Sequence, residues 1–417
     1  MLKPLTLLNS KLEWIILLSS FAIIFAFNLF DRYQNYLEFK SDFYFDTKAI
    51  ILNTYPKATY TLLKIQTDDF IAFTSTNNQN LSQYDHINIS LISSDISFIG
   101  YLRGFLTKNF FIEKLEYSDD SISGFLANLI SNQHQNQTMS MFYKALYLAI
   151  PPSKELINFF NNYGMSHLIA ISGYHLGVLS VIFYFLFNLI YSPLHQKYLP
   201  YRNKKFDIMV AVIVVLFFYL LLIGMVASFL RSFIMFVFGF LLLRANIKIL
   251  SFENLLLTLL VILTFFNHYI FSISLWFSAA GVFYIFLFIH YYKNINKYIL
   301  FFFFNFWIYL SVNPITQYFF GAVSFYQLSS PFLSLVFTIF YPLSLFLHIL
   351  GFGDSFDKLI LLWFSYDVHK IDLFASIYFI IPYILLSLYA IYSKLAFRFV
   401  EICFVSFNLW LFVSLLL

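Results

Sequence analysis

The residues best suited to chemistry in this chain are concentrated in one nonapeptide, His-Leu-Ile-Ala-Ile-Ser-Gly-Tyr-His, at residues 167–175. It brings two imidazoles, a hydroxyl and a glycine into a stretch that is apolar enough to enter a lipid bilayer. Hydrocarbon offers no water to satisfy such groups, so they persist where they pack inside protein or line a wet cavity, and they are usually functional. His167, Ser172, Gly173 and His175 are therefore candidate site residues.

The spacing of these groups limits what they can do together. His167 and His175 are separated by about 80° around an ideal helix, so they share a face only if the helix breaks between them. A metal-binding pair is therefore not expected. Ser172 before Gly173 favours an unwound turn whose freed polar groups face a cavity. Gly173 and Gly177 are also spaced for close helix packing, so a packing role and a site role both remain open for them.

A second candidate is Arg231, the one charged residue in the apolar run 208–243. Gly224 and Ser228 precede it and predict a helix break within the membrane. A buried guanidinium needs an anion or a set of carbonyl groups around it, and this run contains no carboxylate. The partner of Arg231 is therefore a group on another helix, the exposed carbonyls of a helix end, or a phosphate, whose oxygens match the planar fork of donors.

The composition predicts an α-helical polytopic membrane protein. Hydrophobic residues make up 60% of the 417 positions and charged residues 11%, a balance that would leave a soluble protein unable to cover its surface with polar groups. The single cysteine, Cys403, excludes an intramolecular disulfide and a thiolate metal cluster. The formal net charge of +4 is too small to indicate nucleic-acid binding by itself.

The apolar runs predict about ten membrane segments, some of them broken or re-entrant, because one helical crossing takes about 20 residues and two runs are much longer. Residues 1–40 are predicted to be a retained anchor, and Lys3 and Lys11 favour a cytoplasmic N-terminus. The basic loop at 197–205 is predicted to lie on the same side. The apolar run of the anchor is 14–30, and the later runs are 166–192, 208–243, 254–266, 269–289, 298–312, 315–350, 373–393 and 397–417.

Residues 41–118 predict a small β-barrel outside the membrane, inserted after the first helix. Apolar and polar residues alternate there between clusters of Asn, Asp and Ser, which is typical of antiparallel strands. The alternating runs are 47–53, 60–67, 70–76 and 86–92. Residues 119–160 have the spacing of amphipathic helices at a membrane surface, and residues 161–417 form the polytopic domain.

The nonapeptide resembles the His-Leu-x-Ala-Ile-Ser-Gly-x-His-x-Gly signature of the ComEC family of bacterial competence proteins, and Gly177 completes the match. The family's second block, Gly followed by Ser-x-x-Arg-Ser/Ala-x-x-Met, is matched by Gly224, Ser228, Arg231, Ser232 and Met235. Ala227 stands where relatives usually have proline. A third block is only echoed at 272–281, without its acidic residue and glutamine.

The resemblance implies a channel that passes single-stranded DNA across the inner membrane during natural transformation, with an OB-like barrel on the periplasmic side. It implies no enzyme activity, no cofactor and no metal, and a short form without the metallo-β-lactamase-like domain of longer relatives. The implied path residues are His167, Ser172, Gly173, His175, Gly177, Gly224, Ser228 and Arg231.

The resemblance also implies partners. These are single-stranded DNA, a periplasmic DNA receptor, a cytosolic DNA translocase or helicase, single-strand-binding proteins, the lipid bilayer and further copies of the chain in a homo-oligomer. Direct DNA binding by the barrel stays open, because acidic residues outnumber basic ones between 43 and 103 and the electrostatic attraction that dominates strand binding is weak there.

Two alternatives from other classes remain. A small-solute secondary transporter also uses broken helices at mid-membrane, but it commonly contains an internal repeat, and the Ser172-Gly173 block has no second copy. An intramembrane hydrolase needs a nucleophile with a base in reach. Ser172 and His175 are close in sequence, whereas an acid to orient the histidine is missing nearby.

Overall fold

A computed structural model describes residues 10–416 except 58, 68, 78–80, 82–84, 94–95, 116–121, 245–250, 293–295 and 367. The chain forms two compact units. One contains the residues up to Gly124 together with Leu256–Ile273, and the other contains Phe125–Leu255 and the residues from Ser274 onward. The anchor and the β domain, which the sequence predicts as separate parts, therefore belong to one unit.

The first unit begins with helix α1 (Lys11–Ser41), a candidate membrane span of 31 residues. Ser10 starts it as an N-cap by accepting a hydrogen bond from the Glu13 amide. Tyr36 and Phe39, near its other end, are buried in the core of the adjoining sheet. Arg32 also pairs with Asp69, between β2 and β3, at an N–O distance of 3.3 Å. The C-terminal part of α1 is therefore fixed to the sheet.

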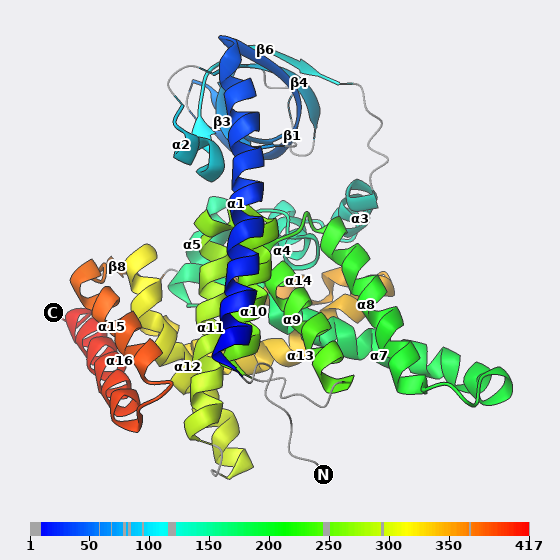
Figure 1. The fold of residues 1–417 in the computed structure, drawn as a ribbon, viewed down its shortest axis with the longest axis vertical. Helices are drawn as coiled ribbons and strands as arrows, with labels where there is room; N and C mark the ends of the chain where they lie inside the picture. Colours follow the sequence, from blue (N-terminus) through cyan, green and yellow to red (C-terminus); the bar gives the residue numbers. More distant parts are fainter. Residues whose placement is uncertain are drawn as a thin grey trace. The chain divides into compact units, whose positions relative to one another are not determined.

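The sheet has six strands in the order β5-β3-β2-β1-β4-β6, and all neighbouring pairs except β3 with β5 are antiparallel. Figure 1 shows it curled beside the end of α1. The long β1 pairs with β4 through its first half and with β2 through its second half. The strands are β1 (Tyr44–Pro56), β2 (Thr61–Gln66), β3 (Ile71–Thr76), β4 (His86–Ile92), β5 (Phe105–Leu106) and β6 (Asn109–Lys114), with helix α2 (Phe98–Arg103) before β5.

The segment from β5 to β6 pairs on both of its flanks. The Thr107 amide donates to the carbonyl of Phe73 in β3, at 2.9 Å, and the carbonyl of Lys108 accepts from the amide of Ile92 in β4, at 3.0 Å. The four strands predicted from alternation are confirmed, whereas α2, β5 and β6 were not predicted.

The remaining elements are mostly helices. They are α3 (Ile122–Ser131), α4 (Gln137–Leu148), α5 (Lys154–Asn162), α6 (Ser166–Ile169), α7 (Gly173–Tyr198), α8 (Lys204–Leu222), α9 (Ala227–Arg244), α10 (Phe252–Phe265), α11 (Ile273–Tyr291), α12 (Lys297–Phe319), α13 (Ser330–Ile349), α14 (Asp357–Phe364), α15 (Ile377–Tyr389) and α16 (Lys394–Ser414). Three short 3₁₀ turns, η1 (Asn267–Phe271), η2 (Phe325–Ser329) and η3 (Gly353–Phe356), and the paired strands β7 (Ala322–Val323) and β8 (Ile371–Asp372) connect them.

Within the described residues, six helices are long and apolar enough to cross a membrane. They are Lys11–Ser41, Ser166–Tyr198, Lys204–Leu222, Ile273–Tyr291, Phe325–Ile349 and Lys394–Ser414. Shorter apolar helices occur at Ile122–Ser131, Ala227–Leu243, Phe252–Phe265 and Ile377–Tyr389. The chain is therefore a helical membrane protein with a small β-sheet, and the count of about ten membrane segments stays a prediction.

Both long apolar runs are divided, as the sequence predicts. The run 208–243 is divided between α8 and α9, and the run 315–350 is divided between the end of α12 at Phe319 and the start of α13 at Ser330. The gap between the runs 298–312 and 315–350 is not a helix end, because α12 continues through Pro314. The Asn313 side chain donates to Asn408 of α16 at 2.6 Å, so a neighbouring helix supports α12 beside Pro314, which lacks a backbone N–H donor.

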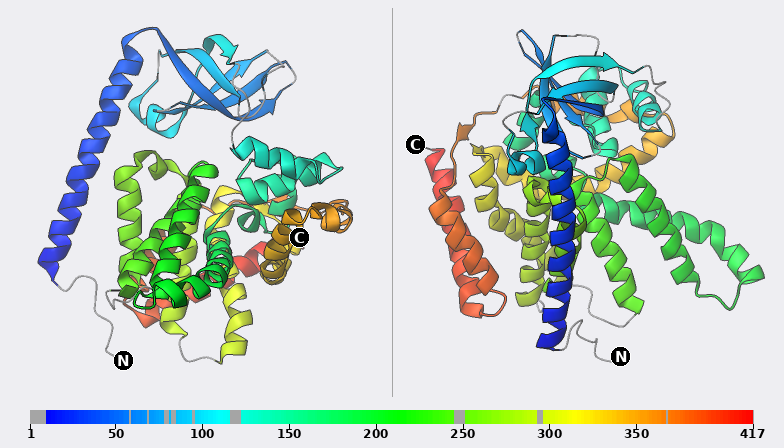
Figure 2. Two further views of the ribbon diagram at one scale, coloured as in Figure 1. Left: turned by 90° about the vertical axis from the view of Figure 1, so that its right-hand side faces the viewer. Right: turned by 45° about the horizontal axis from the view of Figure 1, so that its top comes forward.

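The last helices form a bundle with an aromatic core. Figure 2 shows α15 and α16 running side by side as a hairpin, and Trp307 of α12 is buried against Phe397 and Phe404 of α16. Glu401, also in α16, accepts hydrogen bonds from Trp307 Nε1 at 2.9 Å and from the Tyr292 hydroxyl. This bundle packs the C-terminal third of the chain without contributing any of the candidate site residues.

Candidate functional site

The helix break predicted at Ser172 is present. Helix α6 ends at Ile169, Ser172 has the extended conformation φ −141°, ψ −174°, and α7 begins at Gly173. The Ser172 amide donates to Nδ1 of His175 at 3.2 Å. His175 thus takes the position that Glu or Gln occupies in a capping box and satisfies one of the free amides at the start of α7.

The ring of His175 is fully buried. Because Nδ1 accepts a hydrogen bond, the proton is on Nε2, and Nε2 has no hydrogen-bond partner among the described residues. The ring meets Tyr341 edge-on, with centroids 4.6 Å apart at 81°. Ser172 Oγ lies 3.5 Å from Nδ1, but no described carboxylate orients the ring, so the geometry resembles a helix cap more than a hydrolase dyad.

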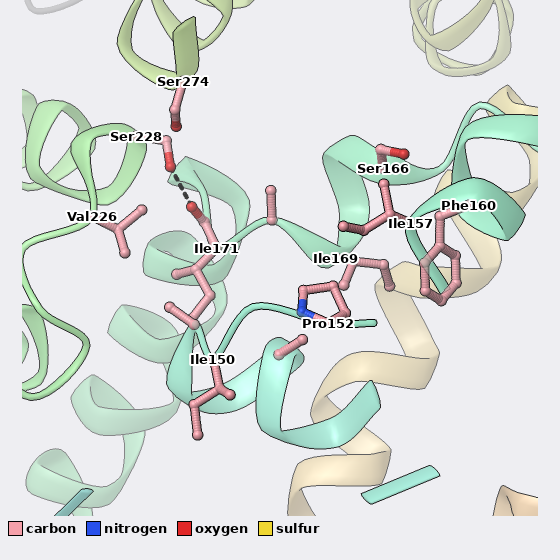
Figure 3. Close-up of a pocket in the computed structure, with 13 residues that line it drawn as sticks. Ile150, Pro152, Ile157, Phe160, Ser166, Ile169, Ile171, Val226, Ser228 and Ser274 are labelled. Atoms are coloured by element: carbon pink, nitrogen blue, oxygen red, sulfur yellow. Dashed lines mark hydrogen bonds between the residues drawn. The ribbon is translucent and has the colours of Figure 1, made fainter. Parts of the chain in front are cut away.

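A left-handed turn separates α8 from α9. Gly224 has φ +71° and Met225 has φ +52°, conformations that glycine adopts freely and other residues rarely do. The turn reverses the chain and brings Ser228 of α9 next to the signature, where its hydroxyl donates to the Ile171 carbonyl. Figure 3 shows this bond, with Val226 and Ser274 beside it. The two helix breaks are therefore joined directly.

Arg231 is buried one helical turn further along α9, with 3% of its surface exposed. Its Nε donates to Ser278 Oγ of α11 at 2.9 Å, its Nη2 donates to Ser232 Oγ at 2.8 Å, and its Nη1 lies 3.6 Å from the sulfur of Met235. No described carboxylate forms an ion pair with it. Within the described residues, the guanidinium is therefore a buried cation that is held by neutral groups alone.

Gly173 allows the start of α7 to lie against this cation. A Cβ atom at Gly173 would lie 2.8 Å from Ser232 Oγ and 3.5 Å from Arg231 Nη2. Free amides and the positive end of the helix dipole are concentrated at a helix N-terminus. The N-terminus of α7 and the guanidinium of Arg231 together make this part of the protein electropositive and suited to an anion.

A cavity of about 240 Å³ lies beside the joined breaks. It is mostly apolar, and Ser166, Ser228 and Ser274 supply its polar side chains. Since a water molecule occupies about 30 Å³ in the liquid, the cavity has room for a handful of waters. Its walls come from the ends of α4 and α5, the signature break, the α8–α9 turn and the start of α11, as Figure 3 shows for the labelled residues.

The segment between α12 and α13 packs against the chain just before the signature. Ser330 Oγ donates to the Gly164 carbonyl at 2.8 Å, and Gln327 Nε2 donates to the Asn161 carbonyl at 3.0 Å. Gly164 has φ +65°, and a Cβ there would lie 3.3 Å from Ser330 Cβ. Residues of η2 and the start of α13, more than 150 positions later in the chain, thus support the segment that leads into the signature.

The structure brings only some of the predicted site residues together. Ser172, Gly173, Ser228 and Arg231 lie around the joined breaks, and buried His175 caps α7.

Three predicted site residues lie apart from this group. His167 is exposed on α6, with Nε2 at 3.5 Å from Ser334 Oγ. Gly177 has no atom within 4 Å of its Cβ position, so close packing does not account for it, and Gly224 acts through its backbone turn.

Sequence reasoning missed two members of the site, Ser274 and Ser278 of α11. Ser278 accepts the hydrogen bond from Arg231 Nε, and Ser274 lines the cavity. Both lie in the stretch that echoes the third block of the ComEC family, and that echo is the one signal in the sequence that points to them.

The sequence model of the family described as "Competence protein" matches residues 152–415. This range contains the signature, the arginine block and the serines of α11. No curated protein and no solved structure matches the chain. The matched range covers well over half of the 417 residues, and the chain therefore belongs to the ComEC-like competence protein family, a membership that indicates a role in DNA uptake.

Proposed function

We propose that this protein is a channel through which single-stranded DNA crosses the bacterial inner membrane during natural transformation. The observation that carries the proposal is Arg231, a buried guanidinium whose partners among the described residues are neutral. Burying an unpaired charge costs several kcal/mol, so such a residue is retained where a mobile anion uses it. A phosphodiester backbone supplies that anion repeatedly as a strand moves.

The surroundings of Arg231 support a transient phosphate contact. Serine hydroxyls hold the guanidinium in place without neutralising it, and the N-terminus of α7 adds its free amides. A carboxylate partner would compete with phosphate, and none is paired with Arg231 in the described ranges. An arginine that contacts only phosphate does not distinguish one base from another, which suits a channel that must pass any sequence.

The described conformation corresponds to a closed channel under this proposal, because the cavity is too small and too apolar for a polynucleotide. Opening would separate α7, α9 and α11, which are joined here by the bonds of Ser228 to Ile171 and of Arg231 to Ser278. Both are hydrogen bonds to neutral groups, each worth only about 0.5–3 kcal/mol net.

The proposal includes the orientation of the chain and its β domain. The N-terminus is cytoplasmic and the sheet is periplasmic, because α1 crosses once. The pairing of the β5–β6 segment with both β3 and β4 supports a closed barrel of the OB type. The partners would be single-stranded DNA, a periplasmic DNA receptor, a cytosolic translocase or helicase with single-strand-binding proteins, and further copies of the chain.

The first test follows labelled duplex DNA in cells that contain or lack this protein. DNA in a nuclease-protected periplasmic pool and DNA in the cytoplasm are scored separately. The proposal expects the periplasmic pool to persist without the protein and the cytoplasmic pool to be lost. Undiminished arrival of DNA in the cytoplasm would contradict it.

The second test replaces Arg231 with Ala or Lys. A charged hydrogen bond is worth about 1.5–3 kcal/mol, so R231A should slow import about 10- to 100-fold. R231K should retain part of the activity, because lysine keeps the positive charge but lacks the planar set of guanidinium donors. Arg398→Ala, at an exposed arginine of α16, is the matched control and should import normally. Normal import by accumulated R231A protein would exclude a phosphate contact.

A further inference from the structure

A second buried polar cluster lies away from the site, where the turn before α4 meets the end of α13 and the start of α14. His134 Nδ1 lies 2.9 Å and 3.1 Å from the two carboxylate oxygens of Asp357. His134 Nε2 lies 3.1 Å from His348 Nε2, and His348 Nδ1 lies 2.7 Å from the Ser344 carbonyl. The four groups form one continuous chain of hydrogen bonds.

Hydrogen-bond chemistry fixes how many protons this chain holds. The Ser344 carbonyl can only accept, so His348 Nδ1 carries a proton. The contact between the two Nε2 atoms needs one proton, and so does the contact between His134 Nδ1 and Asp357. These three contacts need three protons. An ionised Asp357 and two neutral histidines together supply two, so all contacts are satisfied when the cluster holds one extra proton. That proton can lie on Asp357, on His134 or on His348 without breaking a hydrogen bond.

Any other proton count damages the cluster. With the extra proton removed, two lone pairs face each other either at the Nε2 contact or at the Asp357 contact. With a second proton added, the cluster acquires a net positive charge that no partner in it balances. Buried polar networks are stabilising when every member is satisfied and costly when one is not, so the cluster is most stable with one extra proton.

The surroundings give the cluster little other compensation. The His134 side chain is fully buried, and Asp357 exposes 12% of its side chain, which leaves a route for protons to enter. Tyr143 stacks on His134 with centroids 4.7 Å apart, and Tyr147 lies edge-on to His348. Asp354 of η3 is the other nearby carboxylate and is exposed. Burial raises the pKa of Asp357 in spite of its bond to His134.

The cluster joins parts of the chain that are more than 200 residues apart. Gln133 adds to the connection, since its Nε2 donates to the His348 carbonyl at 3.1 Å and its Oε1 accepts from the Gly353 amide at 2.9 Å. Tyr147 of helix α4, which follows this turn, donates to Ser344 Oγ at 2.8 Å. The position of α4 therefore depends on the cluster.

We propose that His134, His348 and Asp357 form a proton-operated clasp that holds α4 against α13 and α14 and opens when its proton count changes. Ala145 in the last turn of α4 and Ala149 at its C-cap line the cavity at the signature, so opening the clasp alters the wall of the proposed DNA path. The effect on transport rests on the proposed function, whereas the clasp itself does not.

The test measures the distance across the clasp in the full chain, in lipid nanodiscs. Spin labels at Gln135→Cys and Lys358→Cys, both exposed, report the distance in a Cys403→Ser background. The proposal expects one short distance in the middle of the range in which carboxyl and imidazole groups titrate, about pH 4 to 8. A longer population should grow toward both ends. A single unchanged distance throughout would overturn the proposal.

The Asp357→Asn variant distinguishes a cluster that responds to its proton count from one with a structural role alone. An asparagine amide donates to His134 Nδ1, so the whole chain of bonds is satisfied without any extra proton. The variant should therefore stay closed at the alkaline end and still open at the acid end. His348→Gln, whose amide suits either tautomer of His134, should also lose the alkaline opening and serves if Asp357→Asn does not accumulate.

His195→Gln, at a half-buried histidine bonded to the Arg202 carbonyl, is the matched control and should behave like the unsubstituted protein. An Asp357→Asn profile identical to that of the unsubstituted protein would overturn the clasp. DNA import is scored separately. If DNA reaches the cytoplasm without this protein while the distance changes with pH as expected, the proposed function alone is refuted. If import requires the protein while the distance stays unchanged at every pH, the clasp alone is refuted.

Discussion

At the scale of single residues, the site depends on contacts that tolerate almost no added volume. Gly173 is the clearest case, because the start of α7 approaches Ser232 and Arg231 closely enough that a methyl group would collide with a hydroxyl. The glycine is used for this approach and not for an unusual backbone conformation, since its φ is not positive. Gly177 lies four residues further along α7, where a methyl group would meet open space.

These two glycines give a matched pair of substitutions. Gly173→Ala should displace Ser232 and the guanidinium and reduce DNA import, at a cost of about 1–3 kcal/mol for overpacking. Gly177→Ala should import normally. Import rates and thermal unfolding of the purified proteins measure the two effects. Equal behaviour of the two variants would show that the close approach of α7 to Arg231 has no role in transport.

At the scale of elements, the arrangement of the site depends on where helices stop. The α8–α9 turn sets the direction of α9 and hence the positions of Ser228 and Arg231. Gly224 lies in the left-handed region, where other L-residues lose about 1–2 kcal/mol, and nothing surrounds its Cβ position. A substitution there therefore tests the backbone conformation without adding a clash.

Gly224→Ala should lower the stability of the protein by about 1–2 kcal/mol and misplace Arg231. Gly224→Asn should be milder, because asparagine visits the left-handed region more readily. The unfolding midpoint and the import rate of both variants check this. If alanine and asparagine had the same effect, conformational strain in the turn would not be the cause.

The sequence predicted local features of these elements well. The strands β1 to β4, the break at Ser172 and the division of the run 208–243 all follow from residue patterns a few positions long. The sequence did not predict β5 and β6, because neither strand shows the alternation of apolar and polar residues. β5 has only two residues, and a register shift in β6 leaves both Phe110 and Phe111 exposed, which breaks the alternation.

Contacts between distant residues could not be predicted from one sequence. Ser278 is 47 positions from Arg231, and the histidine clasp joins residues that look like isolated polar side chains in the sequence. Such pairs arise from tertiary packing, on which local propensity and periodicity carry no information. The sequence therefore predicted the backbone breaks around Arg231, whereas its contact with Ser278 of α11 became visible only in the structure.

At the scale of the whole molecule, the proposed orientation makes the sheet periplasmic and the α7–α8 loop cytoplasmic. Leu106→Cys in β5 and Tyr201→Cys in the loop are both exposed positions, with 71% and 82% of their surface accessible. In a Cys403→Ser background, a membrane-impermeant thiol reagent applied to spheroplasts should label the first and reach the second only after permeabilisation. The opposite pattern would invert the orientation, and labelling of both would contradict the crossing by α7, which separates the sheet from the α7–α8 loop.

Helix α1 continues well beyond its apolar run. Residues 31–41 extend it by about 16 Å at the usual rise per residue, and the aromatic rings of Tyr36 and Phe39 are embedded in the sheet. The candidate membrane span and the segment buried against the sheet are therefore parts of one continuous helix. A mechanical load on the sheet would be transmitted along α1 as a tilt of the whole helix.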